Sequence, residues 1–525
     1  MPLDTSASGR LKRRFRKALN WVSLRKVVQL SALAAFLYLF VTSRQSGLAN
    51  DTLNLPMRLD PLGMLANALA SKTFLAGSSI AILVIILTLV AGRAWCGWLC
   101  PLGTTLDILT PHRKKFDEAK SPAPTWRSVK YGLLLTTLIA ALFGNLTLLA
   151  LDPLTILFRT LTISVWPPVD QLTISLERSL SNVPFLEDFL SSFDSALRPA
   201  VLPNLPLYYR DVILFAAVFI AVVALNWIAP RFWCRYLCPL GALLGLLSKV
   251  AVFRRVVGDD CKDCGICSSR CPTGTIDPDQ NYASDPSECT LCLDCLQQCP
   301  RSSVRIITGF KPAAWQKYDP NRRLVLTSIV AAIAGVALFK SDAAAARQPS
   351  NLIRPPGGVE NDLLSKCIRC GECMRACPTG ALQPARLESG MEGFWTPVVV
   401  PRIGPCSFGC NACGQVCPVQ AIPPLDLEEK QQKVIGRAYI DKNRCIAWAD
   451  HFNCIVCEEM CPVSDKAIKL DTQEFTQSDG TTVKVQLPTV FRERCIGCGI
   501  CEYKCPVNGD AAIRVYVPEK FNTYS

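Results

Sequence analysis

Residues 261–272 read CKDCGICSSRCP, and residues 289–300 read CTLCLDCLQQCP. Both runs have the spacing Cys-x2-Cys-x2-Cys-x3-Cys-Pro, which is the ligand pattern of proteins that bind two [4Fe–4S] clusters. In that pattern the first three cysteines of a run bind one cluster, and the fourth binds the cluster of the other run. The spacing therefore predicts two ligand sets, which are Cys261, Cys264, Cys267 and Cys299, and Cys289, Cys292, Cys295 and Cys271.

Zinc ligation and disulfide bonding are the alternatives for cysteines in such runs. A zinc site needs only four ligands, and a repeated x2-x2-x3-Pro run is typical of clusters rather than of zinc. Disulfide frameworks belong to short secreted chains with little core, whereas this chain has 525 residues and 28 cysteines. We therefore expect the cysteines to bind iron.

Four further runs lie between residues 367 and 505, and each ends in Cys-Pro. The second of them has three residues in its first gap and the third has eight, IAWADHFN. The runs predict four more clusters, one of which could be a [3Fe–4S] centre, and the sequence leaves open which runs exchange ligands. Their cysteines are Cys367, Cys370, Cys373, Cys377; Cys406, Cys410, Cys413, Cys417; Cys445, Cys454, Cys457, Cys461; and Cys495, Cys498, Cys501, Cys505.

Apolar segments precede the first cluster run. Half of the residues are hydrophobic and the mean hydropathy is +0.24, and four apolar stretches occur at 27–42, 74–92, 131–151 and 211–230. The last three have the length of about 20 residues that spans a bilayer. Residues 27–250 are therefore predicted to form a four-helix membrane domain.

Charge predicts how this domain is oriented. The net charge is +13, and residues 1–26 are strongly basic, which could indicate nucleic-acid binding but next to an apolar segment favours a cytoplasmic tail. Loop 93–130 is also basic, whereas loop 152–209 is mainly acidic. The positive-inside rule places the first two in the cytoplasm and loops 43–73 and 152–209 outside. Stretch 173–198 is amphipathic and either lies on the outer surface or forms a solvated helix.

The remaining four cysteines occur in two similar stretches, Trp95–Gly103 and Trp233–Gly241, each with a Cys-x3-Cys-Pro motif. They indicate an internal duplication of two helical hairpins in the same orientation, with the paired cysteines on one helical face. If both faces meet, four thiols can hold a further metal centre. A redox dithiol and a purely structural role are the alternatives for Cys96, Cys100, Cys234 and Cys238.

The sequence lacks the ligand motifs of other redox cofactors. The two histidines, His112 and His451, lie outside the apolar segments, and no Cys-x-x-Cys-His occurs, so we expect no haem. Phosphate-binding glycine motifs are also missing, which argues against nucleotide chemistry. Iron–sulfur centres and quinone remain as electron carriers.

A fifth apolar run, 324–339, separates the cytoplasmic two-cluster domain 251–310 from the rest. Arg322-Arg323 precedes it and resembles a twin-arginine export signal, although the neighbouring residues depart from the usual form. We therefore expect 311–345 to be a fifth span, with Ala343–Ala346 as a potential cleavage site, and 346–525 to be periplasmic; a cytoplasmic 346–525 is the alternative. This last domain opens with a Pro/Gly linker, IRPPGG, and strands are predicted at 483–491 and 511–517.

These motifs together resemble two proteins that are usually separate. Residues 1–310 resemble the NapH-type membrane subunit, with its spans, Cys-x3-Cys-Pro motifs and two-cluster ferredoxin, and residues 311–525 resemble the NapG/MauM-type periplasmic ferredoxin. The resemblance implies oxidation of membrane quinol and delivery of electrons to a periplasmic reductase, such as nitrate reductase, or to a cytochrome. NosR-type proteins share the Cys-x3-Cys-Pro region but add a flavin domain, for which we expect no room here.

The predicted fold is thus an α-helical membrane domain with two α+β ferredoxin-like [4Fe–4S] domains, in a multi-pass protein of the bacterial inner membrane. The predicted function is a quinol dehydrogenase-like electron conduit, for which no catalytic acid or base can be named within the spans. The alternatives are a conduit fed by reduced ferredoxin, and a maturation or regulatory factor that supplies electrons to a periplasmic metalloenzyme.

Overall fold

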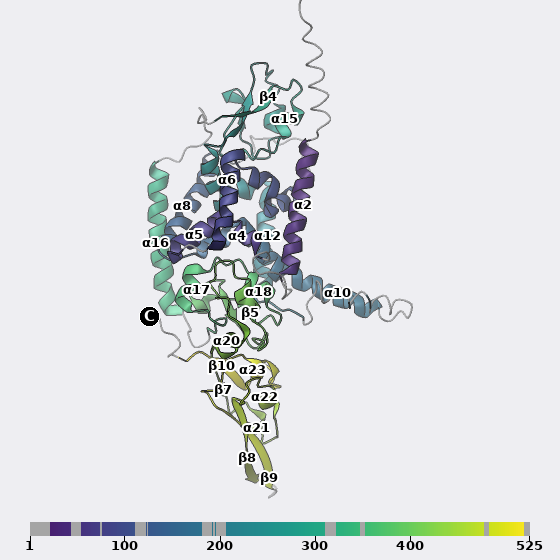
Figure 1. Cartoon of the computed structure of the whole chain (residues 1–525), viewed down its shortest axis with the longest axis vertical. Coiled ribbons are helices and arrows are strands. Elements are labelled where there is room, and N and C mark those ends of the chain that lie inside the picture. Colours follow the sequence, from purple (N-terminus) through teal and green to yellow (C-terminus); the bar gives the residue numbers. More distant parts are fainter. Residues whose placement is uncertain are drawn as a thin grey trace, which may run out of the picture.

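The computed structural model describes residues 21–43, 54–73, 76–110, 124–180, 206–309, 322–346, 352–476 and 482–518, together with residues 122, 192 and 195. The basic tail up to residue 20 and His112 lie outside the described residues. Figure 1 shows three parts along the longest axis. A helical layer (residues 21–248 and 322–346) lies between the 251–309 module at one end and the 352–518 domain at the other.

Several helices of the helical layer stand roughly parallel to the long axis (Figure 1). Among the described residues, α2 alone is long and apolar enough to cross a membrane by length and composition, and four other apolar helices have 10–17 residues. Helix α16 packs against α8. The helices that stand upright are α2 (Trp21–Thr42), α6 (Ala81–Ala91), α8 (Ser128–Leu142), α12 (Val212–Ala224) and α16 (Arg322–Ala346).

The predicted span 131–151 is not one helix. Helix α8 stops at Leu142, and Gly144 takes a positive φ of 79° that ends the helical path. A 3₁₀ turn and then α9 (Pro153–Thr160) follow. The expectation that one helix spans 131–151 is therefore wrong, because this stretch contains most of α8, a break and a 3₁₀ turn.

The predicted outer loops also fold into the layer. Residues from loop 43–73 form α4 (Leu55–Arg58) and α5 (Pro61–Ser71), which Figure 1 shows among the upright helices. All eight residues of α9, from loop 152–209, are buried. Only α10 (Trp166–Leu180) projects away from the layer, at the side of the 352–518 domain (Figure 1); most of 181–198 lies outside the described residues.

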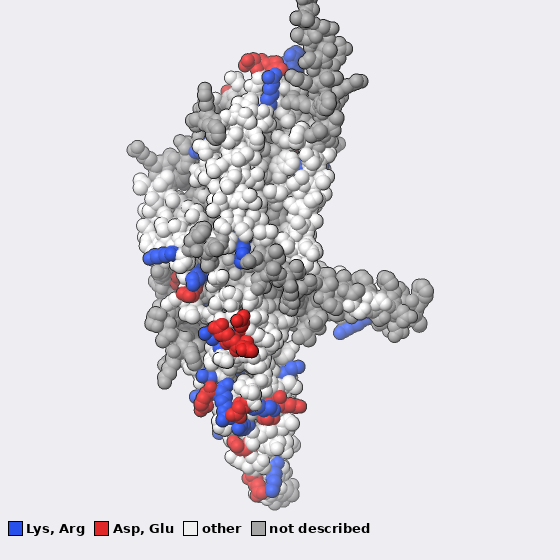
Figure 2. All heavy atoms as spheres, in the orientation of Figure 1, with Lys and Arg blue, Asp and Glu red and all other residues white. Residues whose placement is uncertain are grey.

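The surface of the layer is apolar. Figure 2 shows few Lys, Arg, Asp or Glu side chains over the layer and many over the 352–518 domain. Large apolar side chains are exposed on several of its helices, for example Leu83 at 64%, Ile213 at 84% and Val330 at 66%. Exposed apolar side chains on several helices favour a surface that is covered by a partner or by lipid.

The first and last strands of the 251–309 module pair with each other. Strand β1 (Phe253–Val257) pairs antiparallel with β4 (Val304–Thr308), with Phe253 opposite Thr308. Between them lie the hairpin of β2 (Ile276–Asp277) and β3 (Ala283–Ser284), and the short helices α14 (Ile266–Ser269) and α15 (Asp294–Gln298). The cysteine runs lie in and around these two helices, with Cys267 in α14 and Cys295 in α15.

The 352–518 domain consists of two similar units. The proximal unit (352–432) has the strand pair β5 (Leu382–Pro384) and β6 (Pro397–Val399) and helices α17 (Glu360–Lys366), α18 (Glu372–Ala376), α19 (Ala412–Gln415) and α20 (Leu427–Gln432). The distal unit (437–518) has the strand pair β7 (Arg437–Ile440) and β10 (Ile513–Tyr516) around helices α21 (Ile446–Ala449), α22 (Val456–Glu459) and α23 (Ile500–Lys504).

A long hairpin ends the molecule. Strand β8 (Ile468–Thr476) pairs with β9 (Thr482–Val490) and forms the tip of the distal unit in Figure 1. The structure confirms the strands predicted at 483–491 and 511–517, as β9 and β10.

The IRPPGG stretch is not a linker. Residues 352–356 are buried, and the Arg354 guanidinium forms an ion pair with Glu360 and donates to the Pro397 carbonyl at 2.9 Å. A Cβ on Gly357 would stand 2.7 Å from the Pro423 ring. The Pro/Gly composition reflects tight packing in the proximal unit rather than flexibility.

Candidate iron–sulfur sites

One cavity of the 251–309 module is lined by sulfur from both of its runs. Cys289, Cys292 and Cys295 line it together with Cys271 of the earlier run. The structure therefore brings together one of the two predicted ligand sets, with the predicted exchange of the fourth cysteine. Arg255 Nε donates to Cys295 Sγ at 3.3 Å, a hydrogen bond of the type that tunes cluster potentials.

The other predicted set of this module is partly assembled. Cys261 and Cys267 pack against the Tyr282 cluster, and Cys264 is exposed. Burial raises the pKa of the Cys299 thiol, but N–H groups of nearby backbone outweigh burial and lower that pKa below its ordinary value. A lowered pKa favours the thiolate, the form that binds iron, and the joining of Cys299 to this set stays a prediction.

The distal unit has two sulfur-lined cavities. Cys445, Cys454 and Cys457 line one of them with Cys505 from the last run. The other is lined by Cys495, Cys498, Cys501 and Cys461. These two runs therefore exchange their fourth cysteines, and the first half of the inserted IAWADHFN forms α21 without separating the closely spaced cysteines.

The proximal unit shows the same exchange. Cys417 lies within electrostatic range of Cys370 and Cys373. Cys377 lies within that range of Cys406 and the two cysteines that follow it in its run. The four C-terminal runs therefore pair in chain order, first with second and third with fourth, which the sequence had left open.

The donor sets fit a cluster better than a single ion. In the part of the chain that the structure describes, no three Cys, His, Asp or Glu side chains are close enough to hold one metal ion. Four cysteines around one cavity, however, suit a [4Fe–4S] cube, which is larger than a zinc ion.

We had expected each Cys-x3-Cys-Pro motif to lie on one continuous α-helix, but neither motif does. Trp95–Leu99 forms a π-helix, and Cys100 then caps a new helix, α7 (Pro101–Leu109), with its Sγ accepting from Gly103 N at 3.5 Å. The second motif repeats this with a π-helix, Trp233–Leu237, and α13 (Pro239–Ser248), with Cys238 Sγ accepting from Gly241 N at 3.2 Å. Proline favours the first helical position, so each Cys-Pro starts a helix instead of continuing one.

The four thiols of these motifs nevertheless converge. Cys100 lies within electrostatic range of Cys96 and Cys234, as does Cys238. Cys96, Cys100 and Cys238 are buried and Cys234 is half-buried. The structure therefore places the two motifs near each other with a local geometry that differs from the expected one, and a joint metal site of the four thiols stays a prediction.

Two arginines flank these thiols. Arg231 Nη1 donates to the Cys96 carbonyl at 3.0 Å, and Arg93 Nη2 donates to the Cys234 carbonyl at 3.4 Å. Each arginine therefore crosses from its own repeat to the other. Their positive charges suit a buried group of negative charge, such as a cluster bound by four thiolates.

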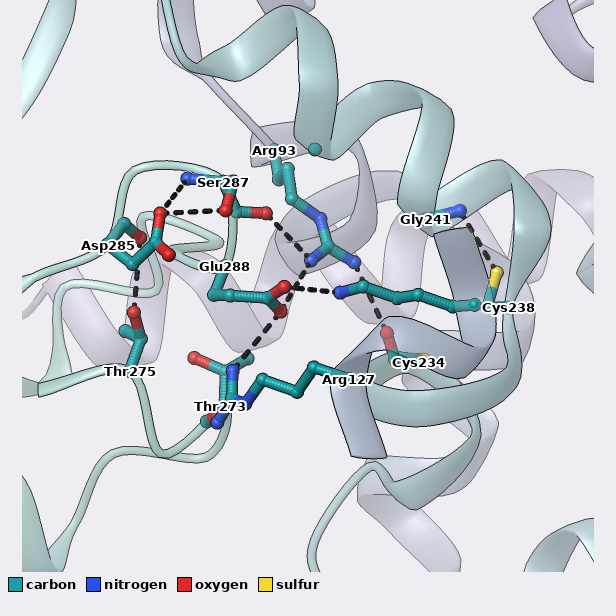
Figure 3. Close-up of polar contacts among 12 residues, drawn as sticks. Arg93, Arg127, Cys234, Cys238, Gly241, Thr273, Thr275, Asp285, Ser287 and Glu288 are labelled. Carbon is teal, nitrogen blue, oxygen red and sulfur yellow. Dashed lines mark hydrogen bonds and ion pairs between the residues drawn. The ribbon is translucent and has the colours of Figure 1, made fainter. Parts of the chain in front are cut away.

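Arg93 also contacts the 251–309 module through Glu288 (Figure 3). Glu288 forms ion pairs with Arg93 and Arg127 at 3.2 Å each and with Lys130 at 2.5 Å. Burial alone would raise the pKa of Glu288, but Lys130, Arg127 and Arg93 lower it to about 2. Glu288 directly precedes Cys289, so this ion cluster fixes the cysteine loop on the helical layer.

Comparison with known proteins agrees with these sites. A family model described as a 4Fe-4S binding domain matches residues 73–117 and 212–258, which include both Cys-x3-Cys-Pro motifs. A second model with the same description matches 364–383 and 488–509. The methylamine utilisation ferredoxin-type protein MauM of Methylorubrum extorquens is 36% identical over 204 residues, which are 38% of this chain and 89% of MauM. The chain belongs to the MauM/NapG family of ferredoxin-type proteins.

Other relatives agree with this assignment. The ferredoxin-type protein NapG of Escherichia coli is 37% identical over 186 residues, 35% of this chain and 78% of NapG. MauM of Paracoccus denitrificans is 35% identical over 187 residues, 35% of this chain and 80% of that protein. No solved structure matches the chain. As a MauM/NapG-type chain it is an iron–sulfur electron-transfer protein.

Direct contacts join successive sulfur sets of this ferredoxin-type protein. Trp98 Nε1 donates to the Leu291 carbonyl at 3.0 Å, and a Cβ on Gly97 would lie 2.4 Å from the Thr290 carbonyl oxygen. The loop of Cys289 and Cys292 therefore rests directly on the loop of Cys96, with no room for a side chain at position 97.

The opposite face of the layer meets the proximal unit. Asn67 Nδ2, on α5, donates to the Lys366 carbonyl at 2.7 Å, next to Cys367. Farther along, Cys406 N donates to the Cys498 carbonyl at 2.8 Å, which joins the proximal and distal units at their cysteines. The sulfur sets of this MauM/NapG-type chain thus follow one another from the layer to the tip.

The spacing of the cysteines did not predict the charged residues of these sites. Arg93 and Arg231 stand three residues before Cys96 and Cys234, in the repeated pattern Arg-x-Trp-Cys. That repeat was a usable signal for both. Glu288 carries no such signal, because one acidic residue beside a cysteine run does not show which cations it will meet.

Proposed function

We propose that this chain oxidises quinol in the helical layer and passes the electrons one at a time to an acceptor at the distal unit. The observation that carries the proposal is that the 251–309 module and the 352–518 domain lie on opposite sides of the helical layer (Figure 1), and that both contain cavities lined by cysteine sulfur. A protein that only stored electrons would need no such alignment across the layer.

The layer is proposed to be the membrane domain, of the NapH type. Its exposed apolar side chains and uncharged surface in Figure 2 support this, as does the length of α2. The 251–309 module would then be cytoplasmic and the 352–518 domain periplasmic, exported through the twin-arginine-like segment at α16. The short helices α5 and α9 would complete the layer, because α9 is buried in protein along its whole length and α5 over its first turns.

Six [4Fe–4S] clusters are proposed in the ferredoxin-type runs and a seventh at Cys96, Cys100, Cys234 and Cys238. These groups supply one-electron transfer, and the protein tunes them through burial and hydrogen bonds to sulfur. Arg255 makes such a bond to Cys295, and Ala438 N makes one to Cys495 Sγ at 3.3 Å. The acceptor is proposed to be a periplasmic reductase, of the nitrate reductase type, or a cytochrome.

A second candidate is entry of electrons through the 251–309 module. The exposure of Cys264 favours it, because a cluster at the surface can accept electrons from a soluble ferredoxin. In this case electrons would cross the layer without quinol.

The two candidates are distinguished with the full chain in liposomes, handled without oxygen. We expect a reduced quinol analogue in the lipid to bleach the visible iron–sulfur absorbance. Reduction by a soluble ferredoxin but not by quinol would support the second candidate. If neither donor reduces a chain that dithionite reduces, both candidates are wrong and the maturation role gains support.

A further inference from the structure

One insertion sets the third C-terminal run apart from the other ferredoxin-type runs. Eight residues, 446–453, lie between Cys445 and Cys454, whereas the first gap of every other such run has two or three residues. The cavity of this site is already lined by four cysteines, Cys445, Cys454, Cys457 and Cys505. The inserted residues are therefore not needed as ligands, so the insertion is available for another role.

The insertion is held by the hairpin of β8 and β9. Asn453 Oδ1 accepts from Gln486 N at 2.8 Å, and Asn453 Nδ2 donates to the Lys484 carbonyl at 3.4 Å. The His451 ring stacks on the Phe475 ring, with 4.0 Å between the ring centroids. These contacts come from both strands of the hairpin, so they fix the inserted loop as a defined surface.

Between these two held residues, Phe452 is open to solvent. It is 65% exposed, and Ile455 is 44% exposed. Both lie within two residues of Cys454, which lines the cavity of the site. Aromatic side chains are enriched at the centre of protein interfaces, because they bury much apolar area when a partner binds. Phe452 and Ile455 therefore offer an apolar contact beside a sulfur set.

The site of Cys445 is the one farther from the helical layer. Figure 1 shows α21 and α22 farther from the layer than α23, which carries Cys501 of the other distal site. That other site is joined to the proximal unit, because Cys406 N donates to the Cys498 carbonyl at 2.8 Å. Electrons that arrive from the layer therefore reach the exposed loop last, which is where an acceptor has to dock.

The charge of the loop indicates the kind of partner. Residues 445–461 include three acidic residues and no Lys or Arg. Two of the three, Asp450 and Glu459, are exposed and form no ion pair within the described part of the chain. Lys442 and Arg444 precede this segment, but the former lies over a tryptophan ring and the latter donates to backbone carbonyls. An acidic rim around an apolar centre attracts a partner whose own contact surface is basic around an apolar centre.

We propose that this loop is the docking site for the electron acceptor, with Phe452 and Ile455 at its centre and Asp450 and Glu459 at its rim. The partner that it fits is a small redox protein whose cofactor edge is exposed, apolar and surrounded by lysine side chains. One electron leaves the reduced site of Cys445 and reduces the oxidised cofactor of the partner, with no bond made or broken. The inference deepens the proposed function, on which it rests, because it names the class of acceptor.

The test uses the full chain, loaded with iron–sulfur clusters, in detergent without oxygen. The chain is reduced with dithionite, freed of the excess on a desalting column and mixed with an oxidised basic cytochrome c, which has lysines around its haem edge. The same cytochrome with its lysines succinylated is the matched probe of opposite charge. Stopped-flow absorbance measures the rate of haem reduction, and isothermal titration calorimetry measures binding of the cytochrome to the oxidised chain.

The variants are Phe452→Ala, which removes the apolar centre, and Asp450→Lys, which reverses a charge at the rim. Leu387→Ala and Glu428→Lys are the matched controls, because Leu387 is 57% exposed, Glu428 is also exposed, and both lie in the proximal unit. Iron content and the visible spectrum verify that every variant carries its clusters.

We expect the wild type to reduce the basic cytochrome at a rate that falls as salt is added, because screening weakens the attraction between opposite charges. The succinylated cytochrome should react about tenfold more slowly. Phe452→Ala and Asp450→Lys should each slow the reaction and weaken binding by about tenfold, the effect of removing an interface hot spot, and both controls should match the wild type. Equal rates for the two cytochromes, or an unchanged rate and affinity in either variant, would refute the docking site.

Dithionite supplies the electrons in this experiment, so its outcome does not depend on quinol. A chain that reduces the basic cytochrome but that quinol fails to reduce in liposomes would refute the proposed quinol oxidation and leave the docking site standing. A chain that quinol reduces but that fails to reduce the basic cytochrome would refute the docking site alone.

Discussion

The guanidinium of Arg159 lies 4.2 Å from the centroid of the Trp395 ring, which joins the helical layer to the proximal unit. The same guanidinium lies 4.8 Å from the centroid of the Phe215 ring. In the described part of the chain no ion pair joins Arg159 to a carboxylate, and its charged or ionisable neighbours are the Arg369 guanidinium and the cysteines Cys370 and Cys367. A buried cation without a carboxylate is stabilised when the adjacent cysteines hold an anionic cluster.

Arg159→Gln should therefore make the reduction potential of the proximal cluster more negative, because the reduced cluster carries one more negative charge. At an effective dielectric constant of about 20 and a separation on the order of 8 Å, the lost attraction is about 2 kcal/mol, or roughly 90 mV for one electron. Redox titration followed by EPR measures the shift. Arg210→Gln is the control, because Arg210 is paired with Glu388 and partly exposed, and a shift of equal size there would contradict a specific role for Arg159.

Glu288 holds the 251–309 module on the layer by neutralising three buried cations. Glu288→Gln leaves Arg93, Arg127 and Lys130 without a counter-charge, and breaking a buried ion pair in this way costs about 3–5 kcal/mol. We expect a lower denaturation midpoint for this module and faster amide exchange in β1 and β4. Asp294→Asn, which loses the less buried pair with Arg25, should have a smaller effect.

The same carboxylate predicts how docking depends on pH. The pKa of Glu288 is lowered from its ordinary value of 4.5 to about 2, so its stabilisation is fully present above about pH 4.5 and is lost as the pH falls toward 2. Stability of the module should thus not change through Glu288 between pH 5 and 8. In the double variant Glu288→Gln with Lys130→Met, part of the lost stability should return, and its failure to return would argue against charge as the cause.

Cysteine spacing predicted most of the sites because a cluster imposes its geometry on a short loop. The exchange of Cys271 was predictable from spacing alone, whereas the order in which the C-terminal runs pair was not, since it depends on how α18 and α19 pack. The strands β9 and β10 were also predictable from their β-branched composition.

The interior of the layer was harder to predict from the sequence. Hydropathy cannot distinguish one long helix from a short helix followed by a turn, and the break at Gly144 depends on backbone conformation. Cys-Pro could have been recognised as a helix start, which would have corrected the i, i+4 expectation for Cys96 and Cys100.

The convergence of the four thiols in the layer predicts a loss of iron when one of them is changed. Cys96→Ser should lower the iron content by about four atoms per chain and remove one EPR signal, with the ferredoxin-type clusters retained. The control is Cys264→Ser, which should remove the EPR signal of a cluster of the 251–309 module instead. Unchanged iron with an altered thiol titration would support a redox dithiol, and unchanged iron and thiol redox behaviour would support a structural role.

Ligand exchange in the distal unit predicts that each fourth cysteine affects the cluster of the other run. Cys505→Ser should alter the cluster of Cys445, Cys454 and Cys457, and Cys461→Ser should alter that of Cys495, Cys498 and Cys501.

The two variants should also differ in which clusters of the distal unit become reduced when quinol is added. Cys498 is bonded through its carbonyl to Cys406 of the proximal unit, so the cluster altered by Cys461→Ser is the one that receives electrons from that unit. Cys461→Ser should therefore leave the outermost cluster oxidised when quinol is added, whereas Cys505→Ser should still allow reduction of the cluster before it. EPR spectra of samples frozen during turnover can resolve the two. If Cys505→Ser instead blocked reduction of the cluster of Cys495, Cys498 and Cys501, the order of the path in the distal unit would be the reverse of the one the contacts indicate.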